Sequence, residues 1–142
     1  MRRTATVVLA LAASSSIALA VTAQKHWMGA IAGRDGAAIT GLGMMMGGKD
    51  ANSTEVTVEI KGDAAGVVRP WHVHVGSCAK GGGVFGGGRS YTPITADEKG
   101  GGSSKAMLAV ALPDTGSYYV QLHESAANMS KIVACGDLSA GK

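Results

Sequence analysis

The chain has 142 residues, of which 46% are hydrophobic and 16% are charged, and its formal net charge is +3. This length is enough for one domain with a modest core. Two of the basic residues, Arg2 and Arg3, lie at the N-terminus, so the charge of the rest is too small to favour a nucleic-acid or other polyanionic partner.

The first 23 residues have the pattern of a secretory signal peptide. Arg2 and Arg3 precede an apolar run at 7–13, and small-residue cleavage sites end at Ala20 and Ala23. The apolar stretch is short and three serines interrupt it, so we expect no membrane span after cleavage. We therefore predict a protein exported to the periplasm or the exterior, with residues 24–142 as its single domain.

The rest of the chain consists of short segments of β-forming residues, separated by Gly, Asp-Gly, Asn and Pro. Val56, Val58 and Ile60 alternate with polar residues, as in a strand with one buried face. We predict strands at 27–32, 37–45, 55–60, 67–75, 106–112, 118–123 and 131–135, with an eighth at 91–96. Seven or eight short strands without helices predict an antiparallel β-sandwich or barrel.

Three of the four histidines fall on two of these strands, His72 and His74 on one and His123 on another. Successive side chains of a strand alternate between its faces, so His72 and His74 point the same way, about 7 Å apart along the backbone. We expect Val73 and Val75 to face the core. Three imidazoles are a ligand set suited to copper or zinc.

Two further groups of residues are candidate copper ligands. If the signal peptide ends at residue 23, the mature chain begins Gln24-Lys25-His26, and a free amine followed by a histidine in third position can bind Cu(II) through square-planar nitrogens. Met44 and Met46 share a strand face and offer thioethers, which favour Cu(I). The alternative is that the methionines fill gaps in a core poor in aromatic residues.

Four short motifs occur in order along the chain: Trp71-His72-Val73-His74, the segment 94–100, Leu122-His123-Glu124, and Val133-Ala134-Cys135-Gly136. Their order and spacing resemble the copper-zinc superoxide dismutase family, over about residues 27–138. The first and third motifs are similar to the family's strands with copper-binding histidines. The second is similar to the hairpin after its zinc loop, and the fourth to its last strand.

The resemblance implies a Greek-key, immunoglobulin-like β-barrel of eight antiparallel strands, with one copper ion held by His72, His74 and His123. It also implies a disulfide between Cys78 and Cys135. That pairing agrees with the cysteine count, since two cysteines in an exported chain most simply form one disulfide.

The chain also departs from the family. Residues 79–93 contain no histidine, so the bridging histidine and the zinc ligands are missing, and we expect no zinc. Ile132 stands where the family has an arginine that guides superoxide. Lys131 beside it is the candidate anion guide, although a lysine lacks the planar fork of arginine.

Two functions remain open for the same ligands. As an enzyme, the protein would be a copper-only superoxide dismutase of weak activity, acting on superoxide. As a binding module, it would carry, buffer or sense copper outside the cytoplasm. A third interpretation is a structural barrel that does not use its histidines. Three histidines also suit catalytic zinc, but Glu124, next to His123 and on the opposite strand face, is a poor general base for it.

Overall fold

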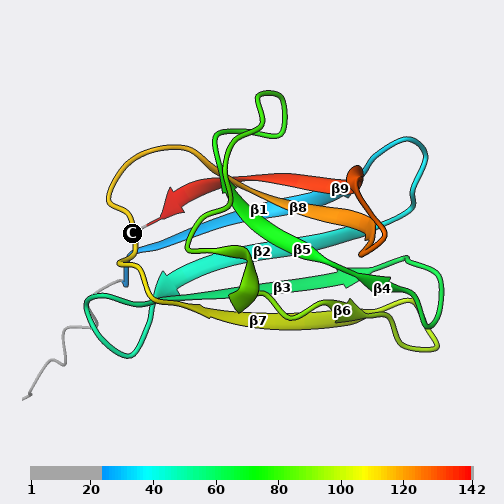
Figure 1. The fold of residues 1–142 in the computed structure, drawn as a ribbon, viewed down its shortest axis with the longest axis horizontal. Helices are drawn as coiled ribbons and strands as arrows, with labels where there is room; N and C mark the ends of the chain where they lie inside the picture. Colours follow the sequence, from blue (N-terminus) through cyan, green and yellow to red (C-terminus); the bar gives the residue numbers. More distant parts are fainter. Residues whose placement is uncertain (1–23, 142) are drawn as a thin grey trace, which may run out of the picture.

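The computed structural model describes residues 24–141, so the signal peptide predicted for residues 1–23 lies outside the described residues. Within the described range the chain is almost entirely β-structure (Figure 1). Its elements are β1 (His26–Gly33), β2 (Thr40–Gly47), β3 (Thr54–Lys61), β4 (Val68–Arg69), β5 (Trp71–Val75), the 3-10 turn η1 (Gly88–Ser90), β6 (Ile94–Thr95), β7 (Gly102–Leu108), β8 (Tyr118–Ser125) and β9 (Asn128–Gly141). Residues 24–141 contain no helix with the length and hydropathy of a membrane span.

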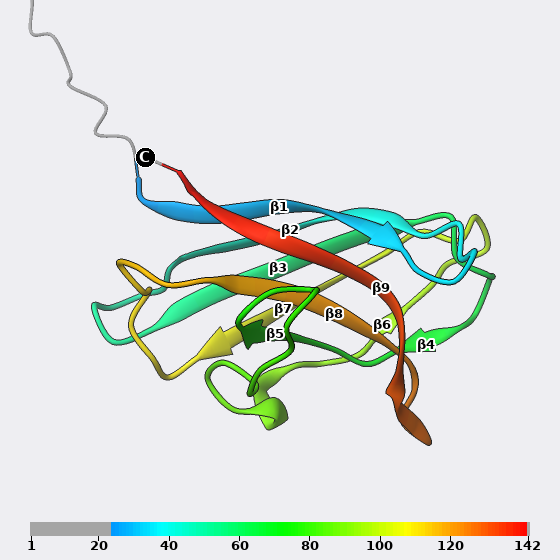
Figure 2. The same ribbon diagram turned by 90° about the horizontal axis from the view of Figure 1, so that it is seen from above.

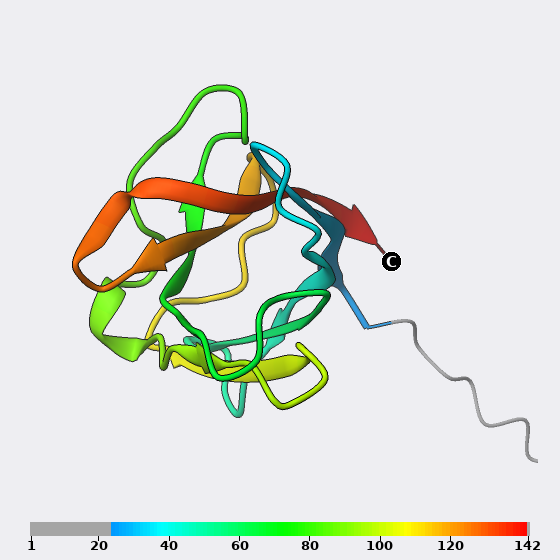
Figure 3. The same cartoon turned by 90° about the vertical axis from the view of Figure 1, so that its right-hand side faces the viewer.

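Seven strands form one antiparallel sheet in the order β5-β8-β9-β1-β2-β3-β7. The sheet curls strongly, and the short β4–β6 pair lies between its two edges, with β4 against β8 and β6 against β7 (Figures 2 and 3). After the β1-β2-β3 meander the chain crosses to β5 at the far edge, and β7 returns beside β3, which is a Greek-key type of connection. The predicted antiparallel β-barrel or sandwich is confirmed.

The concave face of the curled sheet holds the hydrophobic core. Alternation along β3 buries Thr54, Val56, Val58 and Ile60, as the period of two predicts. The largest fully buried side chains include Trp71, Tyr119, Met45, Ile94, Leu108 and Leu122. Polar groups of the core find partners: the Trp71 indole N–H donates to the Thr92 carbonyl over 2.8 Å, and the Thr54 hydroxyl donates to the Val110 carbonyl over 2.8 Å.

Several strand boundaries differ from the predicted ones. The segment 67–75 is split at Pro70, which has no N–H for a ladder hydrogen bond. The strand predicted at 106–112 is Gly102–Leu108, because the polar residues Ser103 and Lys105 pair with β3 on its outer face. The predicted strand 37–45 begins later, at Thr40, and 91–96 is reduced to two residues. The last strand is far longer than 131–135.

One prediction about side-chain direction was half wrong. Val73 is fully buried, but Val75 is 48% exposed. Val75 is the last residue of β5 and pairs with Tyr118, the first residue of β8, so it lies at the end of the ladder where the core no longer covers it.

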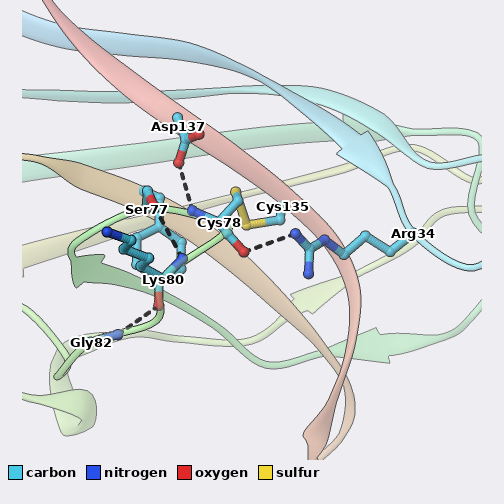
Figure 4. The surroundings of a disulfide bond; sticks show 8 residues. Arg34, Ser77, Cys78, Lys80, Gly82, Cys135 and Asp137 are labelled. Atoms are coloured by element: carbon cyan, nitrogen blue, oxygen red, sulfur yellow. Dashed lines mark hydrogen bonds between the residues drawn. A yellow bond between two sulfur atoms is a disulfide. The ribbon is translucent and has the colours of Figure 1, made fainter.

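The disulfide Cys78–Cys135 joins the segment after β5 to β9, which confirms the predicted pairing (Figure 4). The Cys78 N–H donates to the Asp137 carboxylate over 2.7 Å, and the Arg34 guanidinium donates to the Cys78 carbonyl over 2.9 Å. Cys135 is buried. A disulfide with one cysteine buried and the other, Cys78, half-buried is compatible with an oxidising compartment outside the cytoplasm.

Candidate metal site

The three predicted histidines come together on β5 and β8. One nitrogen of each ring lies within 4.8 Å of the others, so His72, His74 and His123 could hold one metal ion. The ladder between the two strands explains this: Trp71 pairs with Leu122 and both face the core. The histidines next to them in sequence therefore share the opposite face.

The glycine-rich segment after the disulfide covers the free edge of β5. The Val75 N–H donates to the Gly83 carbonyl over 2.9 Å, and the Phe85 N–H donates to the Val73 carbonyl over 2.8 Å. A side chain at Gly82 would come within 1.8 Å of the Val75 carbonyl oxygen, so only glycine allows this approach. The segment thereby brings backbone carbonyls to the histidines.

Two of the rings are oriented by backbone carbonyls. His74 Nδ1 lies 2.8 Å from the Gly82 carbonyl oxygen, and His123 Nδ1 lies 2.6 Å from that of Met129. A carbonyl only accepts, so both Nδ1 atoms carry the proton and both Nε2 atoms keep a free lone pair. This is the tautomer that a metal requires at Nε2.

The nitrogens that could bind a metal ion lie close together. His72 Nδ1 lies 3.1 Å from His123 Nε2. His74 Nε2 is buried and has no hydrogen-bond partner among the described residues. A buried polar atom without a partner costs about 1–3 kcal/mol, so packing alone is a poor explanation for this arrangement. A metal ion would satisfy all three nitrogens, and the donor set fits one.

The surroundings favour the neutral form of two of the imidazoles, those of His72 and His123. Burial, together with the smaller effects of the neighbouring His123 and His74, lowers the pKa of His72 to about 4. Burial also lowers the pKa of His123, although its bond to the Met129 carbonyl partly opposes the shift. Neutral imidazole is the form that binds metals, so near pH 7 protons do not compete for these two rings.

Two tyrosines contact the histidines and were missed by sequence analysis. The Tyr119 ring stacks on His74 with a centroid distance of 5.2 Å, and its hydroxyl accepts the Gly82 N–H over 3.1 Å. The Tyr91 ring meets His72 edge-on at 5.1 Å, and burial raises the pKa of this phenol, which stays protonated. Tyr119 lies opposite His74 in the ladder, so a correct register would have revealed it; Tyr91 sits on an irregular segment without such a signal.

The candidate anion guide Lys131 is ion-paired with Glu124. The other carboxylate oxygen of Glu124 accepts from the Asn128 side-chain amide over 2.7 Å. Both partners hold the pKa of Glu124 below its ordinary value, with Lys131 the larger cause. Glu124 is therefore engaged away from the histidines, as its strand face predicts.

The two further groups of predicted copper ligands lie elsewhere, one at the start of β1 and just before it, the other on β2. His26 pairs with Met46 across the two strands, and its Nδ1 lies 3.0 Å from the Gln24 carbonyl oxygen. Lys25 is ion-paired with Asp114. Met45 is a core residue, as the packing interpretation has it. Met44 and Met46 are only half-buried and belong to the opposite, outer face.

Comparison of the chain with models of known protein families finds no match, and no curated protein matches it either. The structure itself thus supplies a buried three-histidine group that could hold a metal ion, an all-β fold and one disulfide.

Proposed function

We propose that this chain is an exported copper-binding protein, a divergent and reduced relative of the copper-zinc superoxide dismutases, in which His72, His74 and His123 hold one copper ion. The observation that carries the proposal is the buried Nε2 of His74, which has no hydrogen-bond partner among the described residues and belongs to a ring of the three-histidine group. Burying that nitrogen without a hydrogen-bond partner costs free energy, and this cost is relieved only when a ligand fills the space between the rings.

Copper is favoured over zinc by the donor set. All three donors are imidazole nitrogens, which satisfy three-coordinate Cu(I), and Cu(II) stands highest in the order of divalent affinities. Hydrolytic zinc needs a base beside its bound water. The nearest carboxylate in sequence, that of Glu124, is bound to Lys131 and Asn128 instead.

The enzymatic form of this proposal is a weak, zinc-free superoxide dismutase. Copper, when bound, would supply one-electron redox chemistry. The carbonyls of Gly82 and Met129 orient two of the imidazoles, and burial favours the neutral form of His72 and His123. They offer little attraction to an anion, because Glu124 neutralises the lysine closest in sequence to the arginine position of the family. Turnover is therefore expected to be slow.

A non-enzymatic copper carrier, buffer or sensor on the same scaffold is the second candidate. Its support is the enclosure of two of the three ligands: His74 is 9% and His123 is 5% exposed, while His72 is half-buried. A metal held in such a place is protected from solvent and substrates, which suits storage or transport better than turnover.

The test measures metal content and superoxide turnover on one oxidised, copper-titrated sample. One copper per chain with nitrogen coordination in its electron paramagnetic resonance spectrum, together with measurable turnover, supports the enzyme. The same copper without turnover supports the carrier. If no copper is retained, the proposal fails in both forms.

Two variants sharpen this test. His123→Ala is expected to abolish the three-nitrogen copper signal while the circular dichroism spectrum keeps its β-sheet shape, because the core and disulfide do not depend on that ring. Its matched control is Glu124→Gln, one residue further along β8, which should keep the copper. Glu124→Gln also frees Lys131, so an enzyme should gain a few-fold in turnover at low salt. Unchanged copper content in His123→Ala would contradict the site.

A further inference from the structure

The outer face of β1 and β2 carries a square of four soft-metal donors. His26 lies directly opposite Met46, and Met28 lies directly opposite Met44. Alternation places all four on the face away from the core, since Trp27 and Met45, which lie between them in sequence, are 4% and 0% exposed. Met28 is 41% exposed, and the other three are half-buried.

Packing does not explain these methionines. Methionine is a gap-filler of cores, and Met45 has that role. The neighbouring rows of the same outer face carry the polar residues expected beside solvent, among them Thr57, Glu59 and Lys105. The same face also exposes Leu42 and Met107, but three of its four thioethers lie together on the adjacent strands β1 and β2.

The spacing allows the four side chains to converge. Residues directly opposite one another in an antiparallel pair have Cβ atoms about 4.5–5.5 Å apart, and residues two apart on one strand are about 7 Å apart. Long, flexible Met28, Met44 and Met46 side chains can therefore bring their sulfur atoms to one point above the square. Met44 also lines an open groove over β2, β3 and β7, so this face is accessible.

His26 can act as a ligand beside the three thioethers through its Nε2 nitrogen. Its Nδ1 lies 3.0 Å from the Gln24 carbonyl oxygen, which only accepts, so Nδ1 carries the proton and Nε2 has the free lone pair. The ring lies over Gly141 of β9, where a Cβ atom would come within 2.3 Å of Nε2. Gly141 lies on the β9 side of β1, whereas Met46 lies on the β2 side, so the ring must turn about its side-chain bonds to bring Nε2 over the thioethers.

We infer that His26, Met28, Met44 and Met46 form a second metal site, specific for a soft monovalent cation: Cu(I), with Ag(I) as its redox-inert equivalent. Thioethers select Cu(I) over harder divalent ions, and an imidazole completes the set. The site shares no residue with the three histidines, and β8 and β9 separate β1 from β5 in the sheet, so it does not rest on the function proposed above. It uses His26 Nε2, whereas an N-terminal copper site would use Nδ1.

The first measurement is an Ag(I) titration of the oxidised mature protein with ¹³C-labelled methionine methyl groups. We expect the methyl signals of Met28, Met44 and Met46 to shift together, saturating at one ion for the site. The signals of Met45, in the core, and Met107, exposed on β7, should stay in place. Shifts of Met107 equal to those of the three would show nonspecific thioether binding and overturn the site.

The second measurement is Cu(I) competition against a chromogenic chelator. The triple variant Met28→Leu, Met44→Leu, Met46→Leu keeps side-chain volume on an exposed face, and we expect it to lose one of two Cu(I) equivalents. Met107→Leu is the matched control and should lose none. His123→Ala should lose the other equivalent and keep this one, so failure of either site is seen separately. N-terminal acetylation should have no effect; loss of binding on acetylation would overturn the site in favour of the terminal amine.

Discussion

At the scale of single residues, the metal site depends on groups that are not ligands. The Gly82 carbonyl holds the proton on His74 Nδ1, and the Tyr119 hydroxyl in turn accepts the Gly82 N–H. Tyr119 also stacks on the His74 ring. One tyrosine thus fixes both the ring and the segment that orients it, which is the role that outer-shell partners have in metal sites.

Tyr119→Phe is therefore expected to weaken metal binding without abolishing it. The stacked ring remains, but the Gly82 N–H loses its acceptor and the loop carbonyl is less well fixed, so affinity should fall about 10-fold. Competition with a chelator measures this. Tyr118→Phe is the matched control, because the Tyr118 hydroxyl donates to Thr115 over 3.3 Å at the protein surface. Equal effects of the two changes would rule out the positioning role.

The sequence predicted the ligands better than their supports. Strand alternation alone puts His72 and His74 on one face, and the family resemblance adds His123. The carbonyls of Gly82 and Met129 carry no side-chain signature, since every residue has a carbonyl. Their role follows only from how the glycine-rich segment and the β8–β9 hairpin fold back on the sheet.

At the scale of elements, the short strand β4 is held in place by an ion pair rather than by a long ladder. Arg69 makes two hydrogen bonds to the Asp63 carboxylate, at 2.7 and 2.8 Å, and a third to the Glu124 carbonyl at 2.7 Å. Both side chains are largely buried, 13% and 4% exposed. The pair ties the β3–β4 connection to the end of β8, next to His123.

This pair predicts a pH dependence of stability. The hydrogen bonds from Arg69, and secondarily from the Ala64 N–H, lower the pKa of Asp63 below its ordinary value of 3.8. A carboxyl whose pKa is lowered by folding stabilises the native state fully above its unfolded pKa. That stabilisation is lost as the pH falls through the lowered, folded value.

Asp63→Asn leaves the Arg69 charge buried without its partner, so we expect it to lower the free energy of unfolding at pH 7 by about 3–5 kcal/mol. Urea unfolding at pH 7 and below pH 3 measures the effect, and the difference from the unmodified protein should narrow at the lower pH. The control Asp114→Asn, whose partner Lys25 lies at the surface, should change little. A difference that does not vary with pH would show that the carboxylate charge is not what stabilises β4.

Elements were predictable where hydrophobic periodicity was regular. The alternation along β3 predicts the bounds of that strand closely. In contrast, β7 and β9 extend through polar residues such as Ser103 and Asp137. Those residues pair on the outer face of the sheet, and only the neighbouring strand determines that they continue the ladder.

At the scale of the whole molecule, the outer face of the curled sheet carries two regions with different chemistry. The three histidines lie on β5 and β8, and the methionines with His26 lie on β1 and β2. β9 connects the two regions: it pairs with β8 on one side and β1 on the other, and the disulfide anchors the glycine-rich segment to it. The disulfide thus adds a covalent link at the point where the glycine-rich segment over the metal site meets the sheet.

The last prediction concerns that disulfide. Cys78 and Cys135 are 57 residues apart in sequence, and closing such a loop in the unfolded chain is worth about 4 kcal/mol in the chain-entropy model. Replacing both cysteines by alanine should lower the free energy of unfolding in guanidinium by roughly that amount. The histidines should still bind one copper ion, because the β5–β8 ladder brings them together without the disulfide.

The control is reduction of the unmodified protein, which should reproduce the loss of stability with the cysteine side chains still in place. Loss of the nitrogen-coordinated copper signal in a variant that keeps its β-sheet spectrum would contradict this division of roles. In that case the disulfide, acting through the segment from Cys78 to Gly82, would be a positioning element of the site, and the ladder alone would be insufficient to orient His74.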